Sequence, residues 1–154
     1  MSSIAQRLEE LGITLPEAPN PVAAYVPAVQ VGSLVYVSGQ IPFMDGALAF
    51  SGSVPSTVSV DDATVAARMC AINGLAVLSS HLDGQLDRIQ RIVRLGVFVA
   101  SDAGFHDQPR VANGASELMQ DVFGDAGRHA RAAVGSIALP LGATVEVEMI
   151  VQVD

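Results

Sequence analysis

Three charged side chains interrupt the apolar stretch from residue 129 to residue 150: Arg131, Glu146 and Glu148. Alternation predicts two strands here, joined near Pro140, with both glutamates on one face of the second strand. Folding the strands back at that turn lays Glu146 near the middle of its partner and Arg131 near that partner's far end. Two interpretations fit this spacing. One is a plain cross-strand ion pair or rim contact. The other is a guanidinium that forks onto a small carboxylate, with a glutamate placed to hold water.

The other chemically active residue types show no recognisable pattern. The chain has no phosphate loop, zinc-protease helix, nucleophile elbow or dinucleotide fingerprint. His81, His106 and His129 are far apart, so we expect no shared metal site, and only His129 lies near Arg131. Cys70 is the only cysteine, which excludes a disulfide or a cysteine-based metal site within one chain. We interpret Cys70 as a core residue.

The composition limits the classes of partner. Half of the residues are hydrophobic and 16% are charged, against about 25% in an average globular protein. This deficit predicts that strand faces or edges are buried against other subunits. The net charge of −8 opposes binding to a nucleic-acid backbone. The N-terminus is amphipathic and acidic, and prolines interrupt the charge-free stretch 18–44, so neither a signal peptide nor a spanning helix is expected. A cytoplasmic protein without membrane or nucleic-acid partners is the expectation.

Local patterns predict one α+β domain over residues 1–154. Two main helices cannot cover both faces of a five- or six-stranded mixed sheet, so the bare face must meet another subunit. On the first long helix, Val65, Met69, Ile72 and Ala76 fall on one stripe. The expected elements are a helix capped by Ser2 or Ser3 and ending at Gly12, a proline-rich linker over 15–21, a hairpin turning at Gly32 and Ser33, a turn at 44–46 followed by a short strand, a helix over 59–84, a strand over 91–101, a helix over 105–123 and the two closing strands.

Three segments resemble the Rid (YjgF-type) proteins, the reactive intermediate deaminases. YVPAVQVGSLVYVSGQIP, from Tyr25 to Pro42, is similar to their N-terminal hairpin. ARAAVGSIALPLGATVEVE, from Ala130 to Glu148, resembles their closing signature of Ala-Arg, an apolar strand, Leu-Pro and alternating glutamates. NGASEL, residues 113–118, matches a third and weaker block.

The resemblance implies a chorismate-mutase-like fold and a barrel-like homotrimer with three clefts between subunits. It also implies cofactor-independent hydrolysis of enamine or imine intermediates, such as 2-aminoacrylate, to 2-keto acids and ammonia. Arg131 would bind the carboxylate of the substrate, and Glu146 would orient the attacking water. The residues that would line the cleft are Tyr25, Ser38, Gly39, Asn113 and Ala133.

The chain departs from the family pattern at three places. Ala133 stands where the deaminases often have Cys, and His129-Ala130 replaces their usual Pro-Ala. The helix within residues 1–15 and the longer segment 43–59 are extra. Two alternatives to a deaminase therefore stay open. One is a non-catalytic trimer that holds small carboxylates through Arg131. The other, less favoured because of the charge, is an endoribonuclease.

Overall fold

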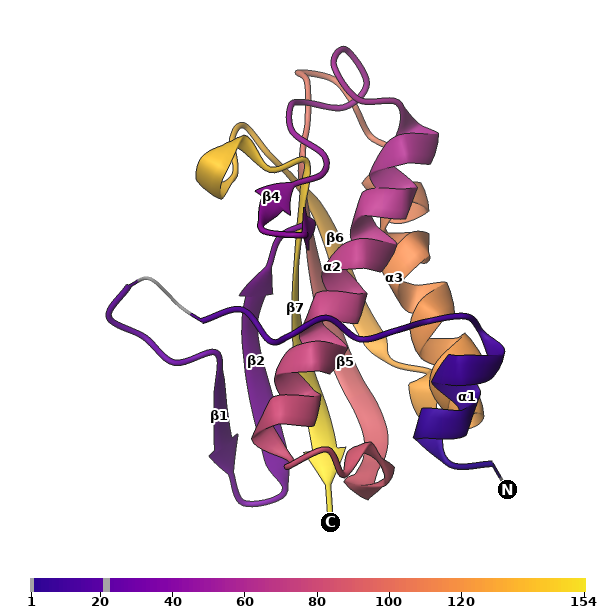
Figure 1. The fold of residues 1–154 in the computed structure, drawn as a ribbon. Helices are drawn as coiled ribbons and strands as arrows, with labels where there is room; N and C mark the ends of the chain where they lie inside the picture. The colour runs from indigo at the N-terminus through magenta and orange to yellow at the C-terminus, as the bar shows by residue number, and fades with distance from the viewer. Residues whose placement is uncertain (1, 21–22) are drawn as a thin grey trace.

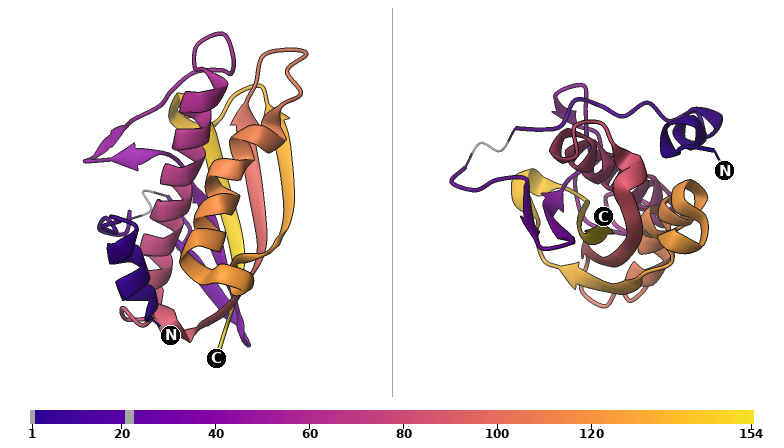
Figure 2. Two further views of the ribbon diagram at one scale, coloured as in Figure 1. Left: turned by 90° about the vertical axis from the view of Figure 1, so that its right-hand side faces the viewer. Right: turned by 90° about the horizontal axis from the view of Figure 1, so that it is seen from below.

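The computed structural model describes residues 2–20 and 23–154, which form a five-stranded sheet with its two long helices on one face (Figures 1 and 2). The strand order is β1-β2-β7-β5-β6, and β3 and β4 form a separate small hairpin. The elements are α1 (Ile4–Glu10), β1 (Ala28–Val31), β2 (Leu34–Gln40), β3 (Phe43–Met44), β4 (Ala47–Leu48), α2 (Val60–His81), β5 (Ile89–Ala100), α3 (Gln108–Phe123), β6 (Ala130–Ser136) and β7 (Val145–Val153), with 3-10 turns at Leu86–Arg88, Gly124–Gly127 and Pro140–Gly142.

Helix α1 has the start and the end that its sequence predicts. Ser3 caps it, and Gln6 bonds back to the Ser3 backbone N–H, which completes a capping box. Gly12 follows the helix with φ +68°, a conformation that favours glycine. The predicted linker then runs without regular structure across the outer side of α2 (Figure 1). The last linker residue, Pro21, lies outside the described residues.

Strand β5 separates the two strands that close the chain. Strand β6 pairs with β5 in parallel, and β7 pairs with the other side of β5 in antiparallel orientation. The predicted direct pairing of the last two strands is therefore wrong. Two parallel neighbours need a long crossover, and α3 provides it between β5 and β6. The short connection at Pro140–Gly142 instead carries the chain past β5 to β7.

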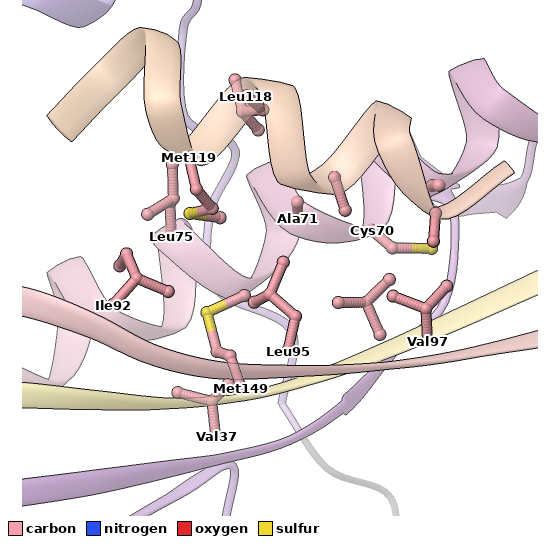
Figure 3. Close-up of a cluster of buried hydrophobic side chains, with 14 of the residues drawn as sticks. Val37, Cys70, Ala71, Leu75, Ile92, Leu95, Val97, Leu118, Met119 and Met149 are labelled. Atoms are coloured by element: carbon pink, nitrogen blue, oxygen red, sulfur yellow. The ribbon is translucent and has the colours of Figure 1, made fainter. Parts of the chain in front are cut away.

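Helices α2 and α3 pack closely because a glycine lies at the contact between them. A Cβ on Gly114 of α3 would overlap the carbonyl oxygen of Thr64 on α2, so the two helix backbones are nearly in contact. Figure 3 shows the core below them. It is formed by side chains from both helices and three strands, among them Val37, Cys70, Ala71, Leu75, Ile92, Leu95, Val97, Leu118, Met119 and Met149.

The predicted stripe on α2 does not face this core. Val65 is 50% exposed, and Met69 and Ile72 are only partly buried, because the alanine-rich face of the helix packs on the sheet instead. Three of its residues, Val65, Met69 and Ile72, line a groove beneath the linker, and the fourth, Ala76, is buried. The predicted inward residues of α3 (Val111, Ala115, Leu118 and Val122) are all buried, as is Cys70. By length and composition α2 could cross a membrane, but 61% of its most apolar window is buried inside the molecule, as in a core helix.

The face of the sheet opposite the helices is uncovered within the described residues (Figure 2). Large apolar side chains remain exposed on its β1, β2 and β6 strands: Val29, Val31, Tyr36 and Val134. An ion pair between Arg94 and Glu148 lies near its centre. An uncovered apolar sheet face favours contact with another protein surface.

Candidate active site

Arg131 lies on the edge strand β6 and points toward helix α3. One guanidinium nitrogen, Nη1, donates to Oδ1 of Asn113 at 2.8 Å and to Oγ of Ser116 at 3.1 Å. These two bonds use both Nη1 hydrogens. The Nε–H and Nη2 side has no hydrogen-bond partner within the described part of the chain. A guanidinium held in this way presents a planar donor edge that can fork onto a carboxylate.

His129 and Ser116 extend the network behind Arg131. His129 Nδ1 lies 2.6 Å from the carbonyl oxygen of Gly127, and a carbonyl only accepts, so Nδ1 carries a proton. In neutral imidazole the other nitrogen, Nε2, is then an acceptor, and Ser116 Oγ donates to it over 2.9 Å. The hydroxyl thus accepts from Arg131 and donates to His129. This chain of bonds fixes the orientation of the guanidinium.

Arg131 lines a shallow pocket of about 350 Å³. Side chains of α3, of the segment before β6 and of β6 itself form its walls. They are Asn113, Ser116, Gln120, Arg128, His129 and Arg131. None of these six carries a carboxylate, although the whole chain has a net charge of −8. The pocket therefore favours anions.

Glu146 lies on the opposite, uncovered face of the sheet. It contacts Gly39 of β2 so closely that a Cβ on this glycine would overlap Oε1 and stand 2.7 Å from Cδ. Partial burial, and secondarily the negative charge of Glu148, raise the pKa of Glu146. Glu148 itself pairs with Arg94 at 3.3 Å. Glu146 is thus a partly desolvated carboxyl group, which is a better proton acceptor than an exposed glutamate once it is ionised.

Arg131 and Glu146 do not form an ion pair in one chain. They occupy β6 and β7, on either side of β5, and their side chains leave the sheet on opposite faces. The interpretation as a cross-strand ion pair is therefore wrong. The predicted alternation on β7 is confirmed, because Val145, Val147 and Met149 face the core.

The other predicted site residues divide between these two places. Asn113 lies beside Arg131, and Ala133 lies two residues further along the same side of β6. Ser38 and Gly39 lie on β2, where Ser38 Oγ donates to the carbonyl of Pro27. Tyr25, which is 54% exposed, precedes β1 at the edge of the sheet away from β6. We call the Asn113–Ser116–Arg131 group the arginine half-site and the Gly39–Glu146 group the glutamate half-site.

Sequence reasoning did not identify Ser116 and Arg128. The signal for Ser116 was its position three residues after Asn113, which places both on one helix face. Arg128 gave no periodic signal because it precedes β6 in an irregular segment. Within residues 2–20 and 23–154 no three His, Cys, Asp or Glu side chains gather in a way that could hold a metal ion.

Comparisons of the sequence and of the structure with known proteins agree on one family. The family model described as "YjgF/chorismate_mutase-like, putative endoribonuclease" matches residues 5–153. Protein TCP17 of Trypanosoma cruzi is 43% identical over 98% of this chain and 94% of its own length. The 2-iminobutanoate/2-iminopropanoate deaminase of Dermatophagoides farinae is 29% identical over 92% and 95%. The crystal structure of Atu1372 from Agrobacterium tumefaciens, a protein of unknown function, is 48% identical with a TM-score of 0.92, covering 98% of this chain and 92% of that one.

Proposed function

This chain belongs to the YjgF/chorismate mutase-like family and has its fold, and on that premise we propose that it hydrolyses small 2-aminoacrylate-like enamines and imines to 2-keto acids and ammonia. The observation that carries the proposal is the arginine half-site, where Arg131 keeps a free donor edge in an anion-favouring pocket. The similarity to a 2-iminobutanoate/2-iminopropanoate deaminase supports the same reaction class.

The active cleft requires two copies of the chain. In one copy the two half-sites lie on opposite faces of the sheet, with β5 between their strands. A second copy that lays its uncovered face along the β6 edge of the first would bring its Glu146 to the first copy's Arg131. The exposed apolar side chains of that face fit such a contact. We propose a homotrimer, in which three such contacts close a ring.

In this cleft the chain supplies binding, orientation and a base. The donor edge of Arg131 holds the substrate carboxylate, which places the adjacent imine carbon at the mouth of the pocket. Glu146 of the neighbouring copy orients water, takes a proton from it as the water oxygen bonds to that carbon, and returns the proton to the nitrogen, which gives a neutral carbinolamine. The hydroxyl proton of the carbinolamine then moves to the nitrogen through Glu146. The C–N bond breaks with its electrons on nitrogen, and ammonia leaves as the C=O bond of the 2-keto acid forms. The imine carbon is already electrophilic, so we propose no cofactor.

The direct test of this proposal is product release. Freshly generated 2-aminoacrylate should give ammonia and pyruvate faster with the protein than without it. Arg131→Ala should lower kcat/KM by about a hundredfold or more, because two charge-assisted hydrogen bonds of about 1.5–3 kcal/mol each are lost. Arg131→Lys should recover only part, since lysine lacks the planar fork. Arg131-dependent binding of 2-ketobutyrate without turnover would establish the non-catalytic alternative.

A subunit-mixing experiment tests the shared cleft. Arg131→Ala and Glu146→Gln chains should each be nearly inactive, since each lacks one half-site. Unfolded together in equal amounts and refolded, they should recover about a quarter of the wild-type activity, because three quarters of random trimers are mixed and each mixed trimer has one intact cleft of three. No recovery in refolded trimers of normal mass would show that both residues act within one chain and would refute the shared cleft.

A further inference from the structure

We infer that the preferred ligand carries two carboxylates: a 2-imino or 2-keto dicarboxylic acid, whose second carboxylate binds Arg128. This inference rests on the proposed function, because it places the first carboxylate on Arg131. Two of the eight arginines of the chain line the one pocket at the arginine half-site. A ligand with a single carboxylate is held by one fork and leaves the second guanidinium without an anion.

The backbone that carries Arg128 is fixed against α3. Gly127, just before it, is buried so closely on the helix that a Cβ would overlap the carbonyl oxygen of Met119 and stand 2.9 Å from Cα of Gln120. The carbonyl of Gly127 accepts from His129 Nδ1, and the carbonyl of Arg128 accepts from Arg91 Nη2 at 3.3 Å. Arg128 therefore extends from a defined backbone position and lines the same pocket as Arg131.

The one carboxylate that pairs with Arg128 within the described residues, that of Asp125, binds it only weakly. Nε of Arg128 lies 3.7 Å from Oδ1 of Asp125, and the Asp125 side chain is fully exposed. Exposed pairs at such distances contribute little, and water or a ligand displaces them easily. Asp125 does not line the pocket, and neither does any other carboxylate. A second ligand carboxylate therefore meets a guanidinium that has no strong partner of its own.

The neutral side chains of the pocket suit the body of such a ligand. Asn113 uses Oδ1 for Arg131 and keeps its amide hydrogens, and Gln120 of α3 also lines the pocket. The pocket volume of about 350 Å³ falls in the range of small-molecule sites. The 2-keto carbon stays next to the carboxylate on Arg131, so the same reaction can occur at the cleft mouth with a longer substrate.

Calorimetric titration of the full-length protein tests the inference. The ligands are 2-ketobutyrate with one carboxylate, 2-oxoglutarate with two, and inorganic phosphate. The variants are Arg128→Ala, Arg131→Ala and Arg110→Ala. Arg110 is the matched control, since its loss changes the net charge equally but its side chain pairs with Asp61 outside the pocket.

We expect wild type and Arg110→Ala to bind 2-oxoglutarate about five- to tenfold more tightly than 2-ketobutyrate, because the second contact is a partly exposed charged one. Arg128→Ala should reduce this ratio to about one, because it should weaken the binding of 2-oxoglutarate much more than that of 2-ketobutyrate. The inference would be overturned if wild type bound 2-oxoglutarate and 2-ketobutyrate equally tightly, or if Arg128→Ala kept the wild-type ratio of these two affinities. It would also be overturned if phosphate bound as tightly as 2-oxoglutarate. If 2-ketobutyrate still bound in an Arg131-dependent way, the proposed function would survive that failure. If wild type bound none of these ligands, both the inference and the proposed function would be refuted.

Discussion

Replacing Gly39 with alanine moves the Glu146 carboxylate without changing any charge. The new methyl group would overlap Oε1 of Glu146 and stand 2.7 Å from Cδ, well inside contact distance. The backbone of Gly39 does not have a positive φ, so alanine adopts it without strain. The side chain of Glu146 must therefore turn away from β2 while the strand stays in place.

The expected cost falls on catalysis and not on stability. A displacement of about 1 Å in a positioned catalytic group reduces turnover by up to about a hundredfold. The moving part is the end of a flexible, half-buried side chain, so the free energy of unfolding should change by less than about 1 kcal/mol. We expect kcat to fall at least about tenfold, with 2-ketobutyrate affinity within about threefold of wild type, because Arg131 is untouched.

Gly96→Ala is the matched control. Gly96 lies on β5, where an alanine Cβ would stand 2.7 Å from Oε1 of Glu148. The substitution would therefore displace Glu148 in place of Glu146. The two variants make the same chemical change against neighbouring glutamates of β7. Ammonia release, calorimetric affinity and light-scattering mass should be measured on both. Both should have the same mass as wild type, which is about 48 kDa for the proposed trimer of the 15.9 kDa chain.

Two results would refute this reasoning. Normal kcat in Gly39→Ala would leave Glu146 without a part in the reaction. Equal losses in both glycine variants would show that crowding on the uncovered face, and not the position of one carboxylate, controls activity.

Further predictions concern pH, the hydrogen-bond network and the buried thiol. The pKa of Glu146 is raised, so its carboxylate forms only at higher pH. The acid limb of the pH profile of kcat/KM should therefore lie above the pKa of about 4.3 that is typical of free glutamate. Glu148→Gln should move that limb to lower pH by removing a negative neighbour, and an unmoved limb would contradict this. Ser116→Ala removes one of two bonds that orient Arg131, and calorimetry should show a roughly two- to tenfold loss of 2-ketobutyrate affinity with an unchanged acid limb. Cys70 is fully buried and burial raises its pKa, so a thiol reagent should label it only after denaturation; rapid labelling of the folded protein would contradict the packed core.

Local sequence determines the elements and their faces. Ser3, Gln6 and Gly12 bound α1 through short-range hydrogen bonds and backbone conformation. The period-2 alternation around Glu146 fixes the face of its side chain, because successive residues of a strand point to opposite sides. The three segments that resemble the family also lie within single hairpins, helices or strand ends, and the family assignment they suggest is confirmed. The roles of Arg131 and Glu146 remain predictions.

Large apolar side chains are an incomplete guide to which face of a buried helix is inward. On α2 the alanine face turns inward, and Val65 and Met69 remain outside. The reason is the close approach of Gly114 to Thr64 and of Gly74 to Met149, which leaves room only for small groups. This contact is between elements, so the periodicity of α2 alone does not contain it.

Only the tertiary structure decided how the candidate site is divided. Short-range patterns predict the last two strands but not their neighbours, because strand order depends on pairing between distant segments. Here β5 pairs with both, in parallel with β6 through the α3 crossover and antiparallel with β7. That order places Arg131 and Glu146 on opposite faces of one chain. Two residues only 15 positions apart in sequence thus belong to separate half-sites, because β5 occupies the position between their strands.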